Sequence, residues 1–277
     1  MNKLQQKLDH LAWLKTIGVE YYCSDEKDSK NSLSKLLSNK KQAQPKKLAK
    51  QLVEPSMPQK PKQSVPKPKE VKQDNPELSR ARELASKASS LDELKNIIEN
   101  FDGCELKDFA TNTVFADGTR GAPILLLGEA PGAKEDEEGI PFCGESGVLL
   151  DKMLEAIGLS RKNNVYITNT IFWRPPANRR PTSSEIAICR PFVEKHIALA
   201  KPKLIILVGS TAITSLLGKE FKISEVRQEI HQYQNEYLDK PIPTTAIFHP
   251  AYLLRQPMQK KTTWYDLLKI KDFIETI

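Results

Sequence analysis

Four short apolar runs lie in the second half of the chain, and helical patterns separate them. The runs are APILLLG at 122–128, NVYITNT at 164–170, KLIILVG at 203–209 and TTAIF at 244–248. Each is bounded by turn residues and rich in aliphatic side chains, which is typical of strands buried on both faces. The stretches GVLLDKMLEAIGL, SSEIAICRPFVEKHIALA and STAITSLLG have helical periodicity. Because strands and helices alternate, we expect a four-stranded parallel sheet inside a three-layer α/β/α sandwich.

The first part of the chain has a different pattern. Residues 1–22 carry apolar side chains at spacings of three and four, which predicts a short amphipathic helix. Residues 23–77 are rich in Lys, Pro and Gln and too polar to form a core, so we expect a disordered linker. PELSRARELASKAS and SLDELKNIIENF then predict two helices, with Ser90 as the N-cap of the second. We therefore expect one folded domain over residues 78–277.

The net charge of +7 comes from the linker. Residues 40–72 hold ten lysines and two glutamates, so the rest of the chain is close to neutral. The basic composition therefore does not indicate that the folded domain binds nucleic acid, and a site of that kind has to be local.

Cysteine spacing and hydropathy indicate the compartment. The four cysteines lie far apart and form no CxxC pair, so we expect a reducing cytoplasm. No apolar run approaches the roughly 20 residues that span a bilayer. Charges through the first residues argue against a secretory signal. We expect a monomer without membrane association.

The ends of the predicted strands are the expected place for a ligand, because parallel α/β sheets bind ligands beyond the carboxyl ends of their strands. Four positions follow: Gly128-Glu129, Asn169, Gly209-Ser210 and His249-Pro250. Taken singly, each has an ordinary reading as a turn residue, surface acid, cap or loop histidine. The acids from Glu135 to Glu138 are interpreted as a solvated face.

In combination these motifs are more specific. GEAPG...ED..G.PF.G..G.LLD is followed by N...WRPP.NR.PT..EI..CRPF and then by HPAYLLR. This order resembles the uracil-DNA glycosylase superfamily, most closely the thermostable bacterial and archaeal family four, over roughly Cys104 to the C-terminus. The resemblance implies base excision repair: the enzyme flips deoxyuridine out of DNA and hydrolyses its N-glycosidic bond. The alternative is a DNA-binding or scaffold protein with the same fold and little or no turnover.

The resemblance also implies roles for single residues. Glu129 would orient the attacking water and favour the developing sugar cation, and His249 would donate to uracil O2 as the base leaves. Phe142 would stack on the flipped base. Asn169 would read the uracil edge through its side-chain amide.

Further positions would bind the base or the DNA strand. The backbone of Ala130, Pro131 and Gly132 would approach the base or the phosphates closely. Leu253 would enter the gap that the flipped base leaves, and Arg255 would lie near the phosphates.

The chain departs from the family at its metal site. Family-four enzymes hold a 4Fe-4S cluster on four cysteines, and this chain has Phe101 and Trp173 at two of those positions. Cys104 and Cys189 remain, and two thiolates cannot complete a four-cysteine site. We therefore expect no cluster and no other cofactor. Ile140 and Glu145 also replace basic residues, which weakens the positive potential near the DNA.

The expected helix at 1–22 lies outside the resemblance. A lone helix of this length is marginal in water, so it either folds back onto the domain or docks on another protein. We favour a protein partner, with residues 23–77 as the tether.

Overall fold

The computed structural model of the chain describes residues 12, 15 and 75–277. The expected helix at 1–22 lies outside these ranges apart from two single positions, and so does the expected linker at 23–77 apart from its last three residues. No helix among the described residues is both long and apolar enough to cross a membrane.

Four parallel strands form the centre of the sheet, as expected. In the order β3-β2-β4-β6 they are Val165–Asn169, Ile124–Gly128, Leu204–Val208 and Ile242–Ile247. Two antiparallel strands that the sequence did not predict extend the edges of this parallel sheet. These are β1 (Asp117–Gly118) beside β3 and β5 (His231–Tyr233) beside β6. Segments of two and three residues are too short to show a hydrophobic period.

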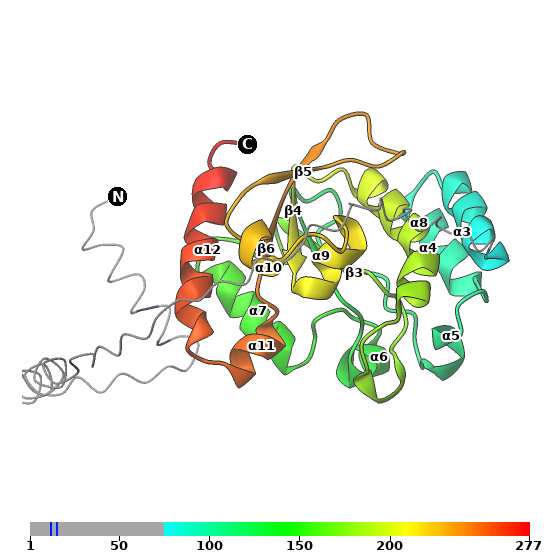
Figure 1. The fold of residues 1–277 in the computed structure, drawn as a ribbon, viewed down its shortest axis with the longest axis horizontal. Coiled ribbons are helices and arrows are strands. Elements are labelled where there is room, and N and C mark those ends of the chain that lie inside the picture. Colours follow the sequence, from blue (N-terminus) through cyan, green and yellow to red (C-terminus); the bar gives the residue numbers. More distant parts are fainter. Residues whose placement is uncertain (1–11, 13–14, 16–74) are drawn as a thin grey trace, which may run out of the picture. The chain divides into compact units, whose positions relative to one another are not determined.

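Helices cover both faces of this sheet, which confirms the α/β/α sandwich (Figure 1). One face packs against α7 (Glu145–Glu155), α11 (Pro250–Arg255) and α12 (Gln259–Ile274). The opposite face packs against α3 (Pro76–Lys87), α4 (Leu91–Asn100), α8 (Ser183–Ala200), α9 (Ser210–Leu216) and α10 (Ile223–Val226). Short elements fill the connections, namely α5 (Leu106–Phe109), α6 (Ala133–Glu138) and the 3-10 turn η1 (Pro176–Asn178).

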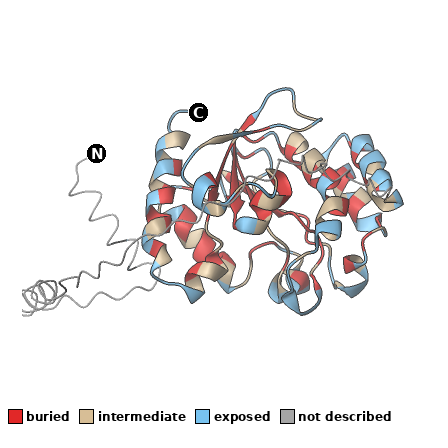
Figure 2. Cartoon of the chain, in the orientation of Figure 1, coloured by how far each residue is buried: buried red, intermediate tan, exposed pale blue. Residues whose placement is uncertain are grey.

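Alternation along the strands explains the two cores, whose buried residues gather on either side of the sheet (Figure 2). In β2, Leu125 and Leu127 point to the α8 side, whereas Ile124 and Leu126 point to the α7 and α12 side. Because every residue of β2 is buried, its sequence is a continuous apolar run.

Strand register brings the expected site residues to one edge of the sheet. Gly128 at the end of β2 is the register partner of Asn169 at the end of β3. On the other side of β2, the Gly209 N–H after β4 donates to the carbonyl of Ile247 at the end of β6, at 3.0 Å. His249 follows two residues later, so side chains from distant motifs meet at this edge.

Candidate active site

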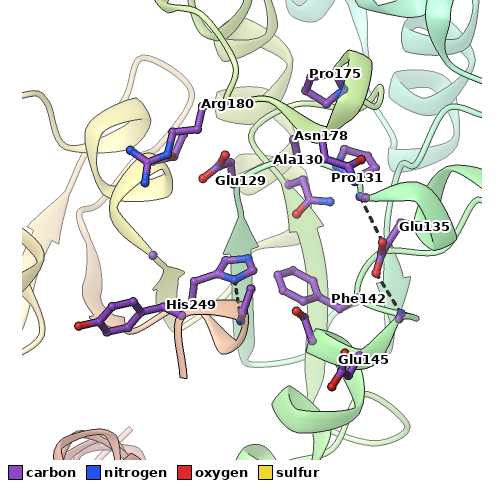
Figure 3. A pocket seen from close by; sticks show the side chains of 18 of the residues that line it. Glu129, Ala130, Pro131, Glu135, Phe142, Glu145, Pro175, Asn178, Arg180 and His249 are labelled. Atoms are coloured by element: carbon purple, nitrogen blue, oxygen red, sulfur yellow. Dashed lines mark hydrogen bonds between the residues drawn. The ribbon is translucent and has the colours of Figure 1, made fainter. Parts of the chain in front are cut away.

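A pocket of about 990 Å³ opens at the carboxyl ends of the four central strands (Figure 3). This volume lies at the upper end of the roughly 300–1,000 Å³ typical of small-molecule sites. Its wall includes most of the expected site residues: Glu129, Ala130, Pro131, Gly132, Phe142, Asn169, His249 and Arg255. The structure thus brings together three motifs that lie far apart in the sequence.

Asn169 presents a polar atom without a partner. The residue is 2% exposed, and its Oδ1 makes no hydrogen bond within the described part of the chain. Gly128, on the neighbouring strand, is what leaves room for it, because a Cβ there would collide with Asn169 Oδ1 and with the ring of Phe142. A buried carbonyl oxygen without a partner is costly, so this atom is suited to accept a hydrogen bond from a ligand.

Phe142 has an unusual backbone. Its φ of 52° lies in the left-handed region, which costs a bulky residue on the order of 1–3 kcal/mol. The ring faces His249, with 5.7 Å between the ring centroids and 33° between the planes. Gly147 sits against the Phe142 carbonyl, where a Cβ would overlap that oxygen. Both Gly128 and Gly147 are therefore needed where Phe142 lies, and an aromatic face is available for a planar ligand.

His249 caps α11, and this fixes its ring. Its Nδ1 accepts a hydrogen bond from the Ala251 N–H at 3.2 Å, so the proton of the neutral ring is on Nε2. Burial lowers the pKa of His249 below its ordinary value; Arg255 lowers it further, and the charges of Glu129 and Glu135 oppose the shift. At neutral pH the ring is therefore an uncharged donor through Nε2.

Glu129 directly follows β2. Hydrogen bonds fix its backbone, whereas its carboxylate makes none with the described residues. Its carbonyl accepts from Thr170 Oγ1 at 2.6 Å and from the Ile171 N–H at 3.1 Å. The carboxylate is half-buried, lines the pocket and lies on the same side of it as Arg180 (Figure 3). Within the described residues it has no hydrogen-bond or ion-pair partner, so it is available to a ligand or a water molecule.

The solvated-face interpretation of Glu135 to Glu138 was wrong for two of the four acids. Glu135 accepts from the Gly132 N–H at 3.1 Å and from the Gly144 N–H at 3.0 Å, so its carboxylate joins two segments of the pocket wall (Figure 3). Asp136 is 4% exposed, and its Oδ1 accepts from the backbone of Thr111 and Asn112 at 2.8 and 3.1 Å. The Asp136 partners lie 25 and 24 residues away and the Gly144 partner of Glu135 lies 9 residues away, so the run of charges gave no sign of these contacts.

Glu137 and Glu138 do lie at the surface, where both pair with Lys134 at 3.3 and 2.8 Å. The pocket wall holds three further cations: Arg179, Arg180 and Arg255. Arg179 is engaged by Glu185 at 2.6 Å. The side chains of Arg180 and Arg255 are exposed and make neither an ion pair nor a hydrogen bond with the residues that the structure describes.

The expected insertion of Leu253 into DNA does not fit this structure. Leu253 is fully buried in the apolar cluster beneath α11 and α7. The residues that α11 contributes to the pocket are Ala251, Tyr252 and Arg255. Residues 252 and 255 lie on one helical face, and Leu253 lies on another. Spacing within HPAYLLR alone does not tell which side chain faces the pocket.

One buried cluster contains Phe101, Cys104, Trp173 and Cys189, the residues that the resemblance places at the metal-ligand positions of family four. Cys104 and Cys189 form a side-chain hydrogen bond, which together with burial raises the pKa of the Cys189 thiol. Phe101 packs edge-on against Phe192 of α8, with 5.0 Å between the centroids. Trp173 is 1% exposed. No group of three or more His, Cys, Asp or Glu side chains among the described residues is arranged to hold a metal. The donors present therefore do not fit a four-thiolate cluster.

The fold is an α/β/α sandwich with one pocket at the strand ends. This pocket presents an aromatic face, an amide, an imidazole and a carboxylate, a set of groups suited to a planar polar ligand. The profile described as the Uracil DNA glycosylase superfamily matches residues 115–269, and the chain belongs to this superfamily. It is similar to the type-4 uracil-DNA glycosylase of Sulfurisphaera tokodaii, at 38% identity over 68% of this chain and 86% of that protein. The type-4 enzyme of Archaeoglobus fulgidus is 38% identical over 65% and 92%, and that of Thermotoga maritima is 37% identical over 62% and 88%.

Proposed function

We propose that this chain removes uracil from DNA by hydrolysing the N-glycosidic bond of deoxyuridine. The observation that carries the proposal is the meeting of Glu129, Phe142, Asn169 and His249 around one pocket. Similarity to several type-4 uracil-DNA glycosylases, at 36–38% identity, supports the same activity. Such an activity belongs with chromosomal DNA, in the bacterial cytosol at the nucleoid.

Recognition follows from the edge of the base. Uracil carries a hydrogen on N3, and Asn169 Oδ1 is the buried acceptor without a partner in the described structure. Cytosine has no hydrogen on N3, so it leaves this oxygen unsatisfied. A site built around such a hydrogen bond rejects an analogue that lacks it by about 10⁴–10⁵-fold. Phe142 stacks on the face of the flipped base.

Bond cleavage needs opposite charges at its two ends. When the bond between C1′ and N1 breaks, its electron pair leaves with uracil and C1′ becomes cationic. His249 donates through Nε2 to uracil O2, where the negative charge collects. The Glu129 carboxylate favours the cationic sugar and holds the water whose oxygen bonds to C1′; the water's proton passes to this carboxylate. The products are an abasic site and the uracil anion, which takes up a proton from solvent as the Glu129 carboxyl releases one to solvent.

The DNA strand is proposed to follow the side of the pocket formed by α11 and η1. Arg180 and Arg255 lie there with side chains that no described residue engages, so phosphates are suitable partners for both. Tyr252 lies beside Arg255 and packs against Phe248, with 5.3 Å between the ring centroids. A protein partner for residues 1–22 and a monomeric state are predictions from the sequence alone.

We also propose that the chain works without an iron-sulfur cluster. The support is the donor set, because the resemblance places Phe101 and Trp173 at two of the four ligand positions. Anaerobically prepared protein should be colourless. Iron and acid-labile sulfide in stoichiometric amounts would refute this part of the proposal.

The activity is tested with labelled oligonucleotides that carry a single uracil or cytosine at the same position. After incubation with the protein and treatment with alkali, we expect a strand break at uracil alone. Intact uracil strands at saturating protein, together with measurable DNA binding, would instead indicate the scaffold protein of the alternative reading.

A further inference from the structure

Arg161 is partly buried in the turn between α7 and β3, and it is not among the residues that the motifs single out. Its side chain is 16% exposed. The guanidinium donates to the carbonyl of Pro141 at 3.1 Å and to the carbonyl of Phe142 at 2.9 Å. Asp117 of β1 and Asp151 of α7 accept from it at 2.8 and 2.9 Å. Four separate groups are therefore joined at one side chain.

The two carbonyls flank the strained residue of the pocket. Phe142 has a positive φ, and such a conformation persists only where the surroundings enforce it. Arg161 binds the carbonyl of Pro141, just before Phe142, and the carbonyl of Phe142 itself. Glu135 holds the Gly144 N–H two residues further on. The loop that carries the Phe142 ring is thus fixed by a cation at its carbonyls and by an anion at its following amide.

We infer that Arg161 is a positioning residue for base recognition, which fixes the Phe142 ring at the place where the flipped uracil stacks. This inference rests on the proposed function. Asp117 and Asp151 accept hydrogen bonds from the guanidinium and so fix its orientation. Its remaining N–H groups then point at the two carbonyls. A planar fork with five donors suits this arrangement, whereas a lysine ammonium has no fixed fork.

A purely structural role is the competing explanation, because Arg161 also ties β1 to α7 through its two ion pairs. The two roles predict different results. A structural brace changes the free energy of unfolding and affects turnover equally whatever residue stands at 142. A positioning residue acts on uracil through Phe142, so its effect depends on the Phe142 ring.

The first experiment measures the loop without relying on turnover. Hydrogen exchange followed by mass spectrometry compares the wild type with Arg161→Gln and Arg161→Lys. We expect exchange over residues 141–147 to rise by about tenfold in Arg161→Gln, to rise less in Arg161→Lys, and to stay unchanged in β2 and β4. Arg120→Gln is the matched control, because Arg120 is also ion-paired, to Asp92, but its side chain is 55% exposed. Unchanged exchange over 141–147 in Arg161→Gln would overturn the inference.

The second experiment is a double-mutant cycle on uracil excision. We expect Arg161→Gln to lower kcat/KM by about tenfold and to weaken inhibition by free uracil, a size typical of coupled neighbours. In a Phe142→Leu background, the same substitution should change kcat/KM by less than about twofold. Equal factors in the two backgrounds would overturn the inference, as would a loss of folding in both Arg161 variants.

These two experiments separate the inference from the proposed function. If the wild type excises no uracil, the proposed function fails, and the positioning role fails with it even if Arg161 orders the loop. If the wild type excises uracil but the cycle is additive, only the role of Arg161 fails.

Discussion

The pocket and the buried cluster around Cys104 and Cys189 lie in one domain but handle polar groups differently. In the pocket, Asn169 Oδ1 is buried without a partner in the described structure, and Phe142 holds a left-handed backbone. In the cluster, Trp173 is buried and its Nε1 donates to Thr113 Oγ1 at 2.9 Å. In the pocket an unpartnered acceptor and a left-handed backbone occur together, whereas beside the cluster His196 Nδ1 is unpartnered within the described residues and the indole N–H of Trp173 is satisfied. The combination found in the pocket is expected at functional sites, so the comparison assigns ligand chemistry to the pocket and packing to the cluster.

Two aromatic side chains, Phe101 and Trp173, lie in the cluster where the resemblance places thiolate ligands, so we expect this region to depend on packing. A metal cluster contributes stability through its bonds, whereas Phe101 and Trp173 contribute through burial of apolar surface. Phe101 has a ring contact with Phe192, and Phe172 and Trp173 meet edge-on with 6.1 Å between the centroids. The region is thus held by ordinary packing.

Removing Trp173 should give the largest effect on stability. We expect Trp173→Ala to lower the free energy of unfolding by about 3–5 kcal/mol, because it leaves a cavity in the core. Excision per folded molecule should be retained at low temperature. Urea unfolding and single-turnover assays on the same preparation measure both quantities. Phe109→Ala, at a side chain that is 66% exposed, is the matched control and should stay within about 0.5 kcal/mol. A stable Trp173→Ala protein would contradict the packing role.

Substitutions in the pocket should lower the excision rate and leave the free energy of unfolding nearly unchanged. We expect Glu129→Gln and His249→Ala each to slow excision by about 10²–10³-fold, because each removes one placed electrostatic group. Thermal unfolding should change little. Glu137→Gln is the control, since Glu137 is exposed on α6 and pairs with Lys134. Wild-type rates in both pocket variants would show that the reaction takes place elsewhere.

His196 packs against the cluster that contains Cys104 and Cys189, so the pH dependence of unfolding tests how this side of the sheet is packed. This fully buried ring stacks on Phe115 and shares a 2.9 Å hydrogen bond with Tyr166, and burial lowers its pKa to about 3. The folded state therefore favours the neutral ring. Above pH 6.5, His196 makes its full contribution to the free energy of unfolding. This contribution falls as the pH drops toward 3, because the ring becomes protonated in the unfolded chain at a higher pH than in the folded protein.

The expected slope from His196 is about 1.4 kcal/mol per pH unit between pH 6 and pH 4. A double variant, His196→Phe with Tyr166→Phe, removes both the titrating ring and its partner. We expect its free energy of unfolding to fall less steeply than that of the wild type over this range. Parallel curves would mean that His196 is protonated in the folded state.

The smallest effect is expected for the two thiols of the buried cluster, Cys104 and Cys189. Cys104→Ala and Cys189→Ala should each cost about 1–2 kcal/mol or less and leave the excision rate unchanged. Dialysis against a chelator should alter neither property in the wild type. Loss of activity with either alanine, or with the chelator, would restore a metal-dependent role to this region.

The sequence was sufficient for the central sheet, because buried parallel strands are continuous apolar runs. Helix α8 was equally readable, since Thr182 and Glu185 form a capping box at its start. The four pocket residues were found through motifs whose order is specific to a family. By contrast, β1 and β5 are too short for any periodic signal.

Other features depend on partners distant in the chain, which local pattern cannot show. Glu135 appeared to be one acid among four, and its bond to the Gly144 backbone depends on how two loops meet. Arg161 was not singled out by any motif, because its acceptors lie up to 44 positions away. Leu253 fitted the expected DNA contact by spacing, but α11 turns it into the core.

The central claim is that the pocket excises uracil while the second region serves only as packing. It is tested most directly by the single-turnover excision rate of one protein preparation, measured against its iron content. Protein with iron below detection should convert a uracil oligonucleotide completely, at a rate that reconstitution with iron and sulfide leaves unchanged. A rate that rises in proportion to bound iron, or is absent from iron-free protein, would contradict the account.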